Sequence, residues 1–78
     1  MLEERIEVEL RGGRPRSFRW RGRRYAIRTI AERWKDTGRW WEGEGTKVFL
    51  RVGGEQGALW EIYFDTAGSA WYLYRVYD

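Results

Sequence analysis

Hydrophobic residues recur at every second position along most of this chain. The segment 5–10 alternates apolar residues with charged ones, and the same period is found in the segments 17–21, 48–52 and 60–64. Successive side chains of an extended strand point to opposite faces of a sheet, so this period gives each segment one apolar face. The pattern therefore predicts an antiparallel β domain whose short strands are joined by glycine-containing turns.

Residues 17–28 are predicted to form a β-hairpin. Gly22 and Arg23 would make its two-residue loop, with Gly22 supplying the positive φ of a type II′ turn. The predicted pairing places Trp20 opposite Tyr25, and Trp20 is expected to lie in the core. The opposite face of the hairpin then carries four arginines, which are Arg19, Arg21, Arg24 and Arg28.

The segment 27–34 has two interpretations. Its apolar residues recur at helical spacing, and residues 29–32 match a capping box, which is typical of the start of a helix. A strand with a β-bulge after Thr29 accounts for the same residues, because a bulge shifts the alternation by one position. We favour the bent strand, since a long curved strand is a common way to close a small barrel.

The C-terminal segment 71–77 is apolar on both faces. Such a strand is expected in the centre of a sheet or at the closure of a barrel rather than at an edge. Together with the preceding segments, it predicts five or six short antiparallel strands and no clear long helix. The expected fold is a small all-β roll or barrel of the SH3-like or OB-like kind.

Length and composition limit the chain to one small folded domain, residues 1–78. Six Trp, five Tyr and three Phe are far more aromatic residues than a disordered chain contains. No apolar run approaches the roughly 20 residues of a membrane span, and the acidic N-terminus lacks the apolar region of a secretory signal. We therefore expect a cytoplasmic protein without membrane contact. The many arginines and few amides are typical of thermophiles, and a GC-rich genome gives the same bias.

The absence of His and Cys removes the commonest general base, the thiol nucleophile and the usual zinc ligands. Glu42 and Glu44 would share one face of an extended segment, and Asp65 lies near a turn. No pattern brings these three carboxylates to a common cleft. We expect no enzymatic activity, no catalytic residues, no metal and no cofactor.

The charged residues are sorted along the chain. Eight arginines and no acid lie between positions 11 and 28, and glutamates precede them at positions 3, 4, 7 and 9. An acidic first strand, residues 5–10, would pair beside the basic hairpin with opposite charges facing each other. The arginines that this pairing leaves over point to an anionic partner, since like charges repel unless something neutralises them.

The run Trp40-Trp41-Glu42-Gly43-Glu44 is a second candidate site. Adjacent side chains of a strand point to opposite faces, so one of the two Trp rings is expected to be more exposed than the other. An exposed Trp beside glycine would stack on a nucleobase or anchor a protein partner. The two glutamates would repel phosphate, which favours a protein partner here. Packing of both rings in the core also accounts for the run.

Several motifs resemble those of an uncharacterised bacterial domain family. The most specific are WRGRRY at residues 20–25 and WWEGE at residues 40–44, and the segments 60–65 and 71–78 also match. The resemblance covers residues 15–78. That family occurs as short stand-alone proteins and at the C-terminus of some Y-family, ImuB-like translesion polymerase proteins. The resemblance implies a module near DNA-damage-tolerance machinery, and it implies no activity and no functional residues.

We expect a non-enzymatic β module that binds nucleic acid without sequence preference. Arginine offers a planar, bidentate donor for phosphate and also stacks on bases. The expected binding residues are Arg19, Arg21, Arg23, Arg24, Arg28, Trp40 and Trp41. The alternative is a protein-interaction module that docks onto a polymerase or another DNA replication or repair protein through an aromatic patch. A solvated arginine-rich face accounts for the same positions without a ligand.

Overall fold

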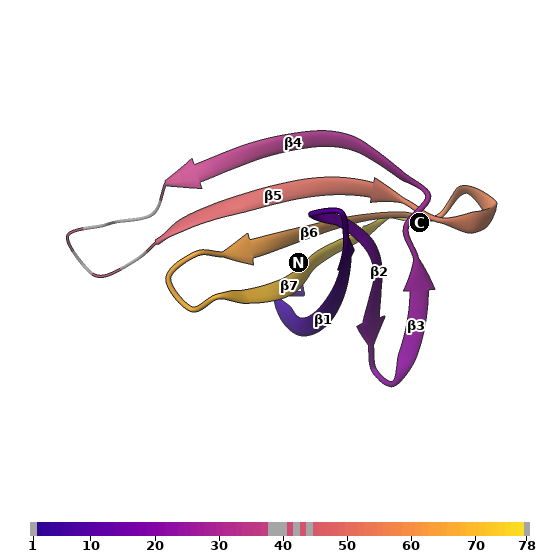
Figure 1. Ribbon diagram of the computed structural model, residues 1–78, viewed down its shortest axis with the longest axis horizontal. Helices are drawn as coiled ribbons and strands as arrows, with labels where there is room; N and C mark the ends of the chain where they lie inside the picture. Colours follow the sequence, from indigo (N-terminus) through magenta and orange to yellow (C-terminus); the bar gives the residue numbers. More distant parts are fainter. Residues whose placement is uncertain (1, 38–40, 42, 44, 78) are drawn as a thin grey trace.

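One antiparallel sheet makes up nearly all of the part of the chain that the computed structural model describes, residues 2–37, 41, 43 and 45–77 (Figure 1). Its seven strands follow the order β3-β2-β1-β7-β6-β5-β4 across the sheet. The strands are β1 (Glu4–Arg11), β2 (Arg14–Trp20), β3 (Arg23–Ala26), β4 (Thr29–Thr37), β5 (Thr46–Gly53), β6 (Leu59–Asp65) and β7 (Ala70–Tyr77), and a short 3-10 turn, η2 (Glu55–Gly57), joins β5 to β6. The prediction of an all-β fold is confirmed.

The sheet curls into a half-barrel that is open between β3 and β4. All other strands that are consecutive in the sequence are paired, and β1 pairs with β7. Two backbone hydrogen bonds hold the crossover from β3 to β4. The Ile27 N–H donates to the Arg16 carbonyl at 2.8 Å, and the Arg28 N–H donates to the Gly53 carbonyl at 2.7 Å. The long strands β4 and β5 therefore meet the β2–β3 hairpin at this end, where the hairpin runs across their direction (Figure 1).

The segment 27–34 is extended, as the favoured interpretation predicts, and the register shift between Ile30 and Glu32 is the expected bulge. Two details of the prediction are wrong. The structure has seven strands rather than five or six. The chain from Tyr25 onward is not one continuous curved strand, because β3 ends at one edge of the sheet and β4 begins at the other. The position of β7 between β1 and β6 confirms that the last strand is central.

The loop of the β2–β3 hairpin is Arg21-Gly22 and not Gly22-Arg23. Trp20 lies opposite Arg23, whereas Phe18 lies opposite Tyr25. Both loop residues have positive φ, 51° and 76°, as a type I′ turn requires. Compared with the prediction, the loop lies one residue earlier in the chain, and each β2 residue therefore pairs with a β3 residue two positions earlier. A shift of two positions keeps every side chain on its predicted face, so the apolar face is unchanged. Trp20 packs against the core but is only half-buried.

The core fills the concave side of the sheet. Its buried members come from five strands and are Ile6, Phe18, Leu50, Val52, Trp60, Ile62 and Leu73. The Trp60 ring meets Phe18 edge to face, with ring centres 5.0 Å apart. A side chain on Gly54 would place its Cβ 2.4 Å from the Trp60 ring. Glycine at this position thus lets the β5–β6 connection pack directly on Trp60.

The convex side of β4 to β7 carries a row of rings that we call the aromatic ladder: Trp34, Phe49, Tyr63 and Tyr72. These residues are direct partners across the four strands. Successive ring centres lie 5.4, 5.0 and 5.1 Å apart. Cross-strand aromatic pairs stabilise a sheet, and here they do so on the face opposite the core. Burial, followed by the nearby Glu3 carboxylate, raises the pKa of Tyr63 to about 12.

Candidate functional site

The hairpin brings only some of the predicted arginines together. Arg19 and Arg24 lie opposite each other on the outer face of β2 and β3. Arg21 lies in the loop, Arg23 faces the Trp20 side, and Arg28 lies in the crossover to β4. All five side chains belong to exposed residues. They surround the hairpin rather than form one row on it.

Glutamates form ion pairs with three of these five arginines. Arg21 donates two hydrogen bonds to Glu4, from Nη2 at 2.7 Å and from Nε at 3.1 Å. These bonds, followed by one from the Trp20 indole N–H, lower the pKa of the Glu4 carboxyl. The hydrogen bonds to Glu4, followed by its negative charge, raise the pKa of Arg21. The Arg21 guanidinium also lies 4.7 Å from the centre of the Trp20 ring. The loop arginine is therefore held on the protein's own carboxylate and ring.

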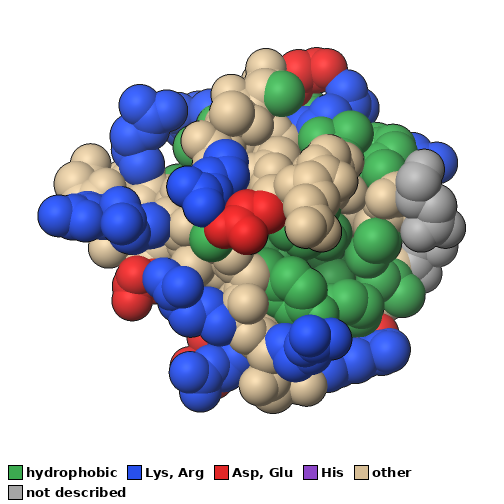
Figure 2. Space-filling model, turned by 90° about the vertical axis from the view of Figure 1, so that its right-hand side faces the viewer, with side chains coloured by type: hydrophobic (Ala, Val, Ile, Leu, Met, Phe, Trp, Pro, Cys, Tyr) green, Lys and Arg blue, Asp and Glu red, His purple; other side chains and the backbone are tan. Residues whose placement is uncertain are grey.

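The acidic strand β1 lies beside the hairpin, as the charge order predicts. Glu7 is the direct partner of Arg19 in the register, and Glu9 lies 3.8 Å from Arg24. Glu55 pairs with Arg28 at 2.5 Å. Lys and Arg side chains and acids both appear in the view from the crossover end (Figure 2). The outer face of the hairpin is consequently close to charge balance.

Trp41 follows β4, whose C-terminal end lies far from the hairpin (Figure 1). Its side chain is strongly exposed, with 67% of its surface accessible. Trp40, Glu42 and Glu44 fall outside the described residues, so the comparison of the two Trp rings extends only to Trp41. The fold does not bring Trp41 to the predicted arginines.

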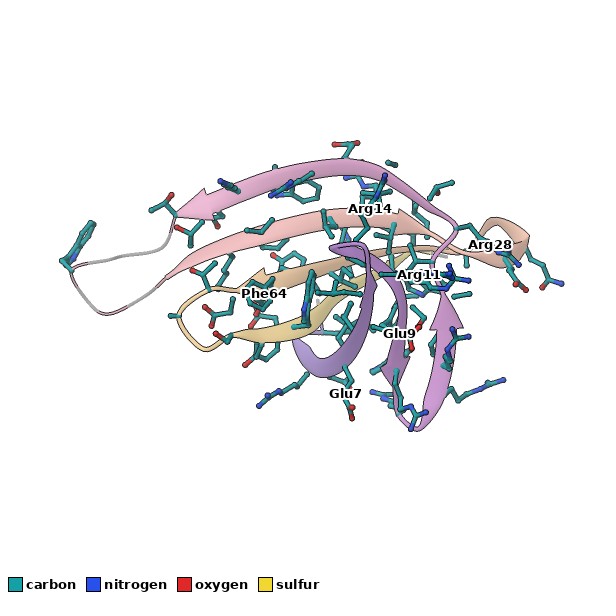
Figure 3. All side chains as sticks on the ribbon, in the orientation of Figure 1. Glu7, Glu9, Arg11, Arg14, Arg28 and Phe64 are labelled. Atoms are coloured by element: carbon teal, nitrogen blue, oxygen red, sulfur yellow. The ribbon has the colours of Figure 1, made fainter. Side chains whose placement is uncertain are left out.

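An open groove on the concave side is the candidate site that the sequence did not indicate. It lies between the β1–β2 turn and β4 to β7, and has a volume of about 390 Å³. Its apolar lining includes Leu10, Pro15, Ile30, Val48, Leu50, Phe64 and Trp71. Arg14 contributes from the start of β2 and Arg33 from β4. Figure 3 shows Arg14 reaching from the start of β2 toward β4.

The cations of the groove have no acidic partner among the residues that the structure describes. Neither Arg14 nor Arg33 forms an ion pair there, and none of the residues lining the groove is acidic. Arg11 is the strand partner of Arg14, and Lys35 follows Arg33 by two positions on β4. An uncompensated cluster with apolar walls focuses positive potential and attracts anions. The groove therefore carries the stronger anion-binding potential of the two basic regions.

The outer face of β4 to β7 is a second candidate surface. Beside the aromatic ladder, the Arg51 guanidinium lies between the rings of Trp34 and Tyr77, at 5.7 and 5.6 Å from their centres. Arg51 donates to the buried Glu61 at 3.1 Å and also bonds Glu32. The Tyr77 hydroxyl donates to Glu61 as well. These contacts tie the edge strand and the C-terminal strand together and compensate the charge of Arg51.

The sequence contained one indirect signal for the groove. Beyond the bulge in β4, Arg33 alternates with Trp34, and therefore lies on the face opposite that ring. That the β1–β2 turn lies across from this face depends on the curl of the whole sheet, which alternation does not reveal. Arg11 and Arg14 belonged to the basic run but not to the predicted hairpin.

The described residues contain no group of His, Cys, Asp and Glu side chains arranged to hold a metal ion. Within the same residues there is no helix with the length and apolarity needed to cross a membrane.

The curled sheet and its groove define a small all-β domain with an uncompensated cationic surface on its concave side. The sequence profile of a family described as "Domain of unknown function (DUF6504)" matches residues 1–78, and the chain belongs to this family. The match includes the N-terminal strand, which the motif resemblance beginning at residue 15 left out. No curated protein and no solved structure matches the chain.

Proposed function

We propose that this domain binds nucleic acid without sequence preference and that the groove between the β1–β2 turn and β4 is its main contact surface. The proposal rests on a difference in charge compensation between two groups of arginines. Arg14 and Arg33 have no acidic partner in the described part of the chain, whereas three of the hairpin arginines are paired with glutamates. Guanidinium groups bind phosphate in bidentate geometry, and phosphate contacts supply most non-specific affinity.

The hairpin extends this surface in the proposal. Arg19, Arg21, Arg23, Arg24 and Arg28 are exposed, and surface ion pairs are worth only about 0 to 1 kcal/mol. A phosphate can therefore replace a glutamate at modest cost. Trp40 or Trp41 would add a stacking contact for a strand long enough to reach the far end of β4.

The proposal covers the setting of the protein as well. OB-like barrels bind single-stranded nucleic acid along a basic groove that contains aromatic side chains. We propose that this half-barrel is of the OB-like or SH3-like type. We propose a setting near translesion polymerase proteins of the ImuB-like kind, which the motif resemblance implies, and a cytoplasmic location. The function is binding without catalysis.

Titration of labelled DNA at several salt concentrations tests the proposal. Each phosphate contact contributes about −0.7 on single strands or −0.9 on duplex to the slope of log K against log salt. Three to five contacts predict a slope of roughly −2 to −4. The Arg14→Ala/Arg33→Ala variant should flatten the slope by about two contacts' worth, and the charge-matched Arg19→Ala/Arg24→Ala variant should change it less. Equal slopes for both variants and the parent would contradict the groove as the site.

Protein docking through the outer face of β4 to β7 is the second candidate function. The observation in its favour is that the aromatic ladder and Tyr74 form a contiguous set of rings on the face opposite the core. Aromatic side chains are enriched at interface hot spots. The expected partner is a polymerase or another DNA replication or repair protein. No DNA binding at low salt, with co-purification of such a protein that Tyr74→Lys abolishes, would favour this function.

A further inference from the structure

The floor of the groove contains two aromatic rings. Phe64 on β6 and Trp71 on β7 are direct strand partners, with ring centres 5.1 Å apart and an angle of 53° between the rings. Both side chains are half-buried and both line the groove. Ile6 flanks Trp71 on the other side, from β1. The rings are thus fixed by their neighbours while one side of each faces the open groove.

The polar atom of Trp71 is available to a ligand. The Trp20 indole N–H donates to Glu4 at 3.0 Å, whereas the Trp71 indole N–H has no hydrogen-bond partner among the described residues. It is also not a buried polar atom without a partner, since the described residues contain none. Solvent therefore reaches the Trp71 indole nitrogen, beside a cationic wall.

The rings in the middle of the aromatic ladder have no free face on which a base could stack. Phe49 and Tyr63 lie between neighbouring rings, and both are buried, with 7% and 4% of their surface exposed. Their faces are therefore already occupied by other rings. A nucleobase stacks on an accessible ring, and the groove combines two half-buried rings with two arginines that have no ion pair among the described residues.

The shape of the groove decides between single-stranded and double-stranded nucleic acid. The site is concave, with Arg14 on one wall and Arg33 on the other, and its volume of about 390 Å³ is that of a pocket for one small ligand. The bases of a duplex are paired and stacked inside the double helix, so they cannot enter such a pocket. An unpaired base can enter it while its phosphates remain at the walls.

We propose that the groove takes a single-stranded segment, with a base against Trp71 and Phe64 and the flanking phosphates at Arg14 and Arg33. This inference rests on the proposed nucleic-acid function and specifies its ligand. Charge complementarity fixes the backbone contacts, and the rings of the floor supply a preference for unpaired bases that cations alone would not give.

A comparison of ligands tests the inference on the unmodified protein. We expect oligo(dT) to bind roughly 5- to 100-fold more tightly than an abasic oligonucleotide of equal length, with the same salt slope, because base stacking adds affinity and phosphate contacts set the slope. Equal affinities would overturn the stacking inference. Displacement of oligo(dT) by poly-glutamate of matched charge as readily as by unlabelled oligo(dT) would also overturn it, since the groove would then recognise charge alone.

A set of variants gives an independent test. Trp71→Leu should lower oligo(dT) affinity by a similar factor and leave duplex affinity unchanged, whereas Trp71→Phe should keep most of the single-strand affinity. Trp34→Leu is the matched control on the opposite face of the sheet and should leave the affinity for both ligands unchanged. An equal loss for single strands and duplex would overturn the inference. The proposed function fails separately, if the Arg14→Ala/Arg33→Ala variant binds both ligands as the parent does.

Discussion

The outer face of the hairpin and the concave groove both carry arginines, but they differ in what lies opposite. On the hairpin, β1 supplies Glu7 beside Arg19 and Glu9 beside Arg24. In the groove, Arg14 has no acidic partner in the described part of the chain. Alternation in β1 explains the difference, because Ile6 and its apolar neighbours face the core while the intervening glutamates face outward. The position of the acidic residues, rather than the number of arginines, therefore determines which surface keeps an uncompensated positive charge.

The two regions also differ in how deeply the aromatic rings beneath their arginines are buried. Phe18, on the inner side of the hairpin, is 1% exposed and packs against Tyr25 and Trp60. Phe64, on the floor of the groove, is half-buried. The hairpin therefore covers the core, whereas the groove leaves part of the apolar surface uncovered. The following predictions test this contrast, beginning with the largest effect.

Truncation of the two phenylalanines should give different losses of stability. Phe18→Ala removes a fully buried ring and should cost about 3 to 5 kcal/mol of unfolding free energy. Phe64→Ala should cost less than half of that, about 1 to 2 kcal/mol, because solvent already reaches part of the ring. Urea unfolding of the two variants measures both values. Equal losses would mean that the groove is packed as tightly as the core.

Much of this sheet was predictable from local patterns. The alternation in 48–52 and 60–64 gave β5 and β6, and the two apolar faces of 71–77 gave the central position of β7. The bulge in β4 followed from the shift in alternation near Thr29. Each of these features depends on residues close together in sequence, which is why a local pattern contains them.

The groove and the aromatic ladder depend on long-range register. Trp34, Phe49, Tyr63 and Tyr72 lie on four strands, and the first three interrupt the polar face of their own segments. Nothing local shows that they align. The loop of the hairpin was misplaced by one residue because Gly22 satisfies the positive φ of either two-residue loop. The difference in charge compensation between the hairpin and the groove was not predictable, because charge was counted along the chain, while β1 and β4 distribute it in space.

Gly54→Ala should destabilise the packing of the β5–β6 connection on Trp60. The new Cβ would lie 2.4 Å from the Trp60 ring and 3.2 Å from the Ala26 carbonyl oxygen, so the packing there must shift. Overpacking of this kind costs about 1 to 3 kcal/mol. Gly68→Ala is the control, because its Cβ would come no nearer than 3.7 Å to another atom. Thermal unfolding of both variants should show a loss for position 54 alone, and equal midpoints would contradict the packing of Gly54 on Trp60.

Removal of the β1 acids should make the hairpin resemble the groove. In Glu7→Gln/Glu9→Gln, Arg19 and Arg24 lose their acidic neighbours, so the salt slope for DNA should steepen by one to two contacts, about 0.7 each on single strands. Glu3→Gln/Asp36→Asn changes the net charge equally away from the hairpin and is the control. The same steepening in both variants would show that net charge, and not local compensation, separates the two regions.

The smallest expected effect is the response of the hairpin to acid. Arg21 and then Trp20 lower the pKa of Glu4 below its ordinary value of 4.5, so the ionised carboxylate stabilises the folded state. This contribution is fully present above the ordinary value and is lost as the pH falls through the lowered pKa of the folded protein. Glu4→Gln keeps an acceptor without the charge, so the parent should be slightly more stable near neutral pH and no more stable in acid.

Urea midpoints of the parent and of Glu4→Gln across this pH range provide the measurement. A difference that does not change with pH would show that Glu4 acts through shape and hydrogen bonding alone. If the difference disappears in acid, Arg21 has lost its negative partner there. The hairpin loop then carries an uncompensated guanidinium, as Arg14 does in the groove, and the two regions should respond alike to added anions.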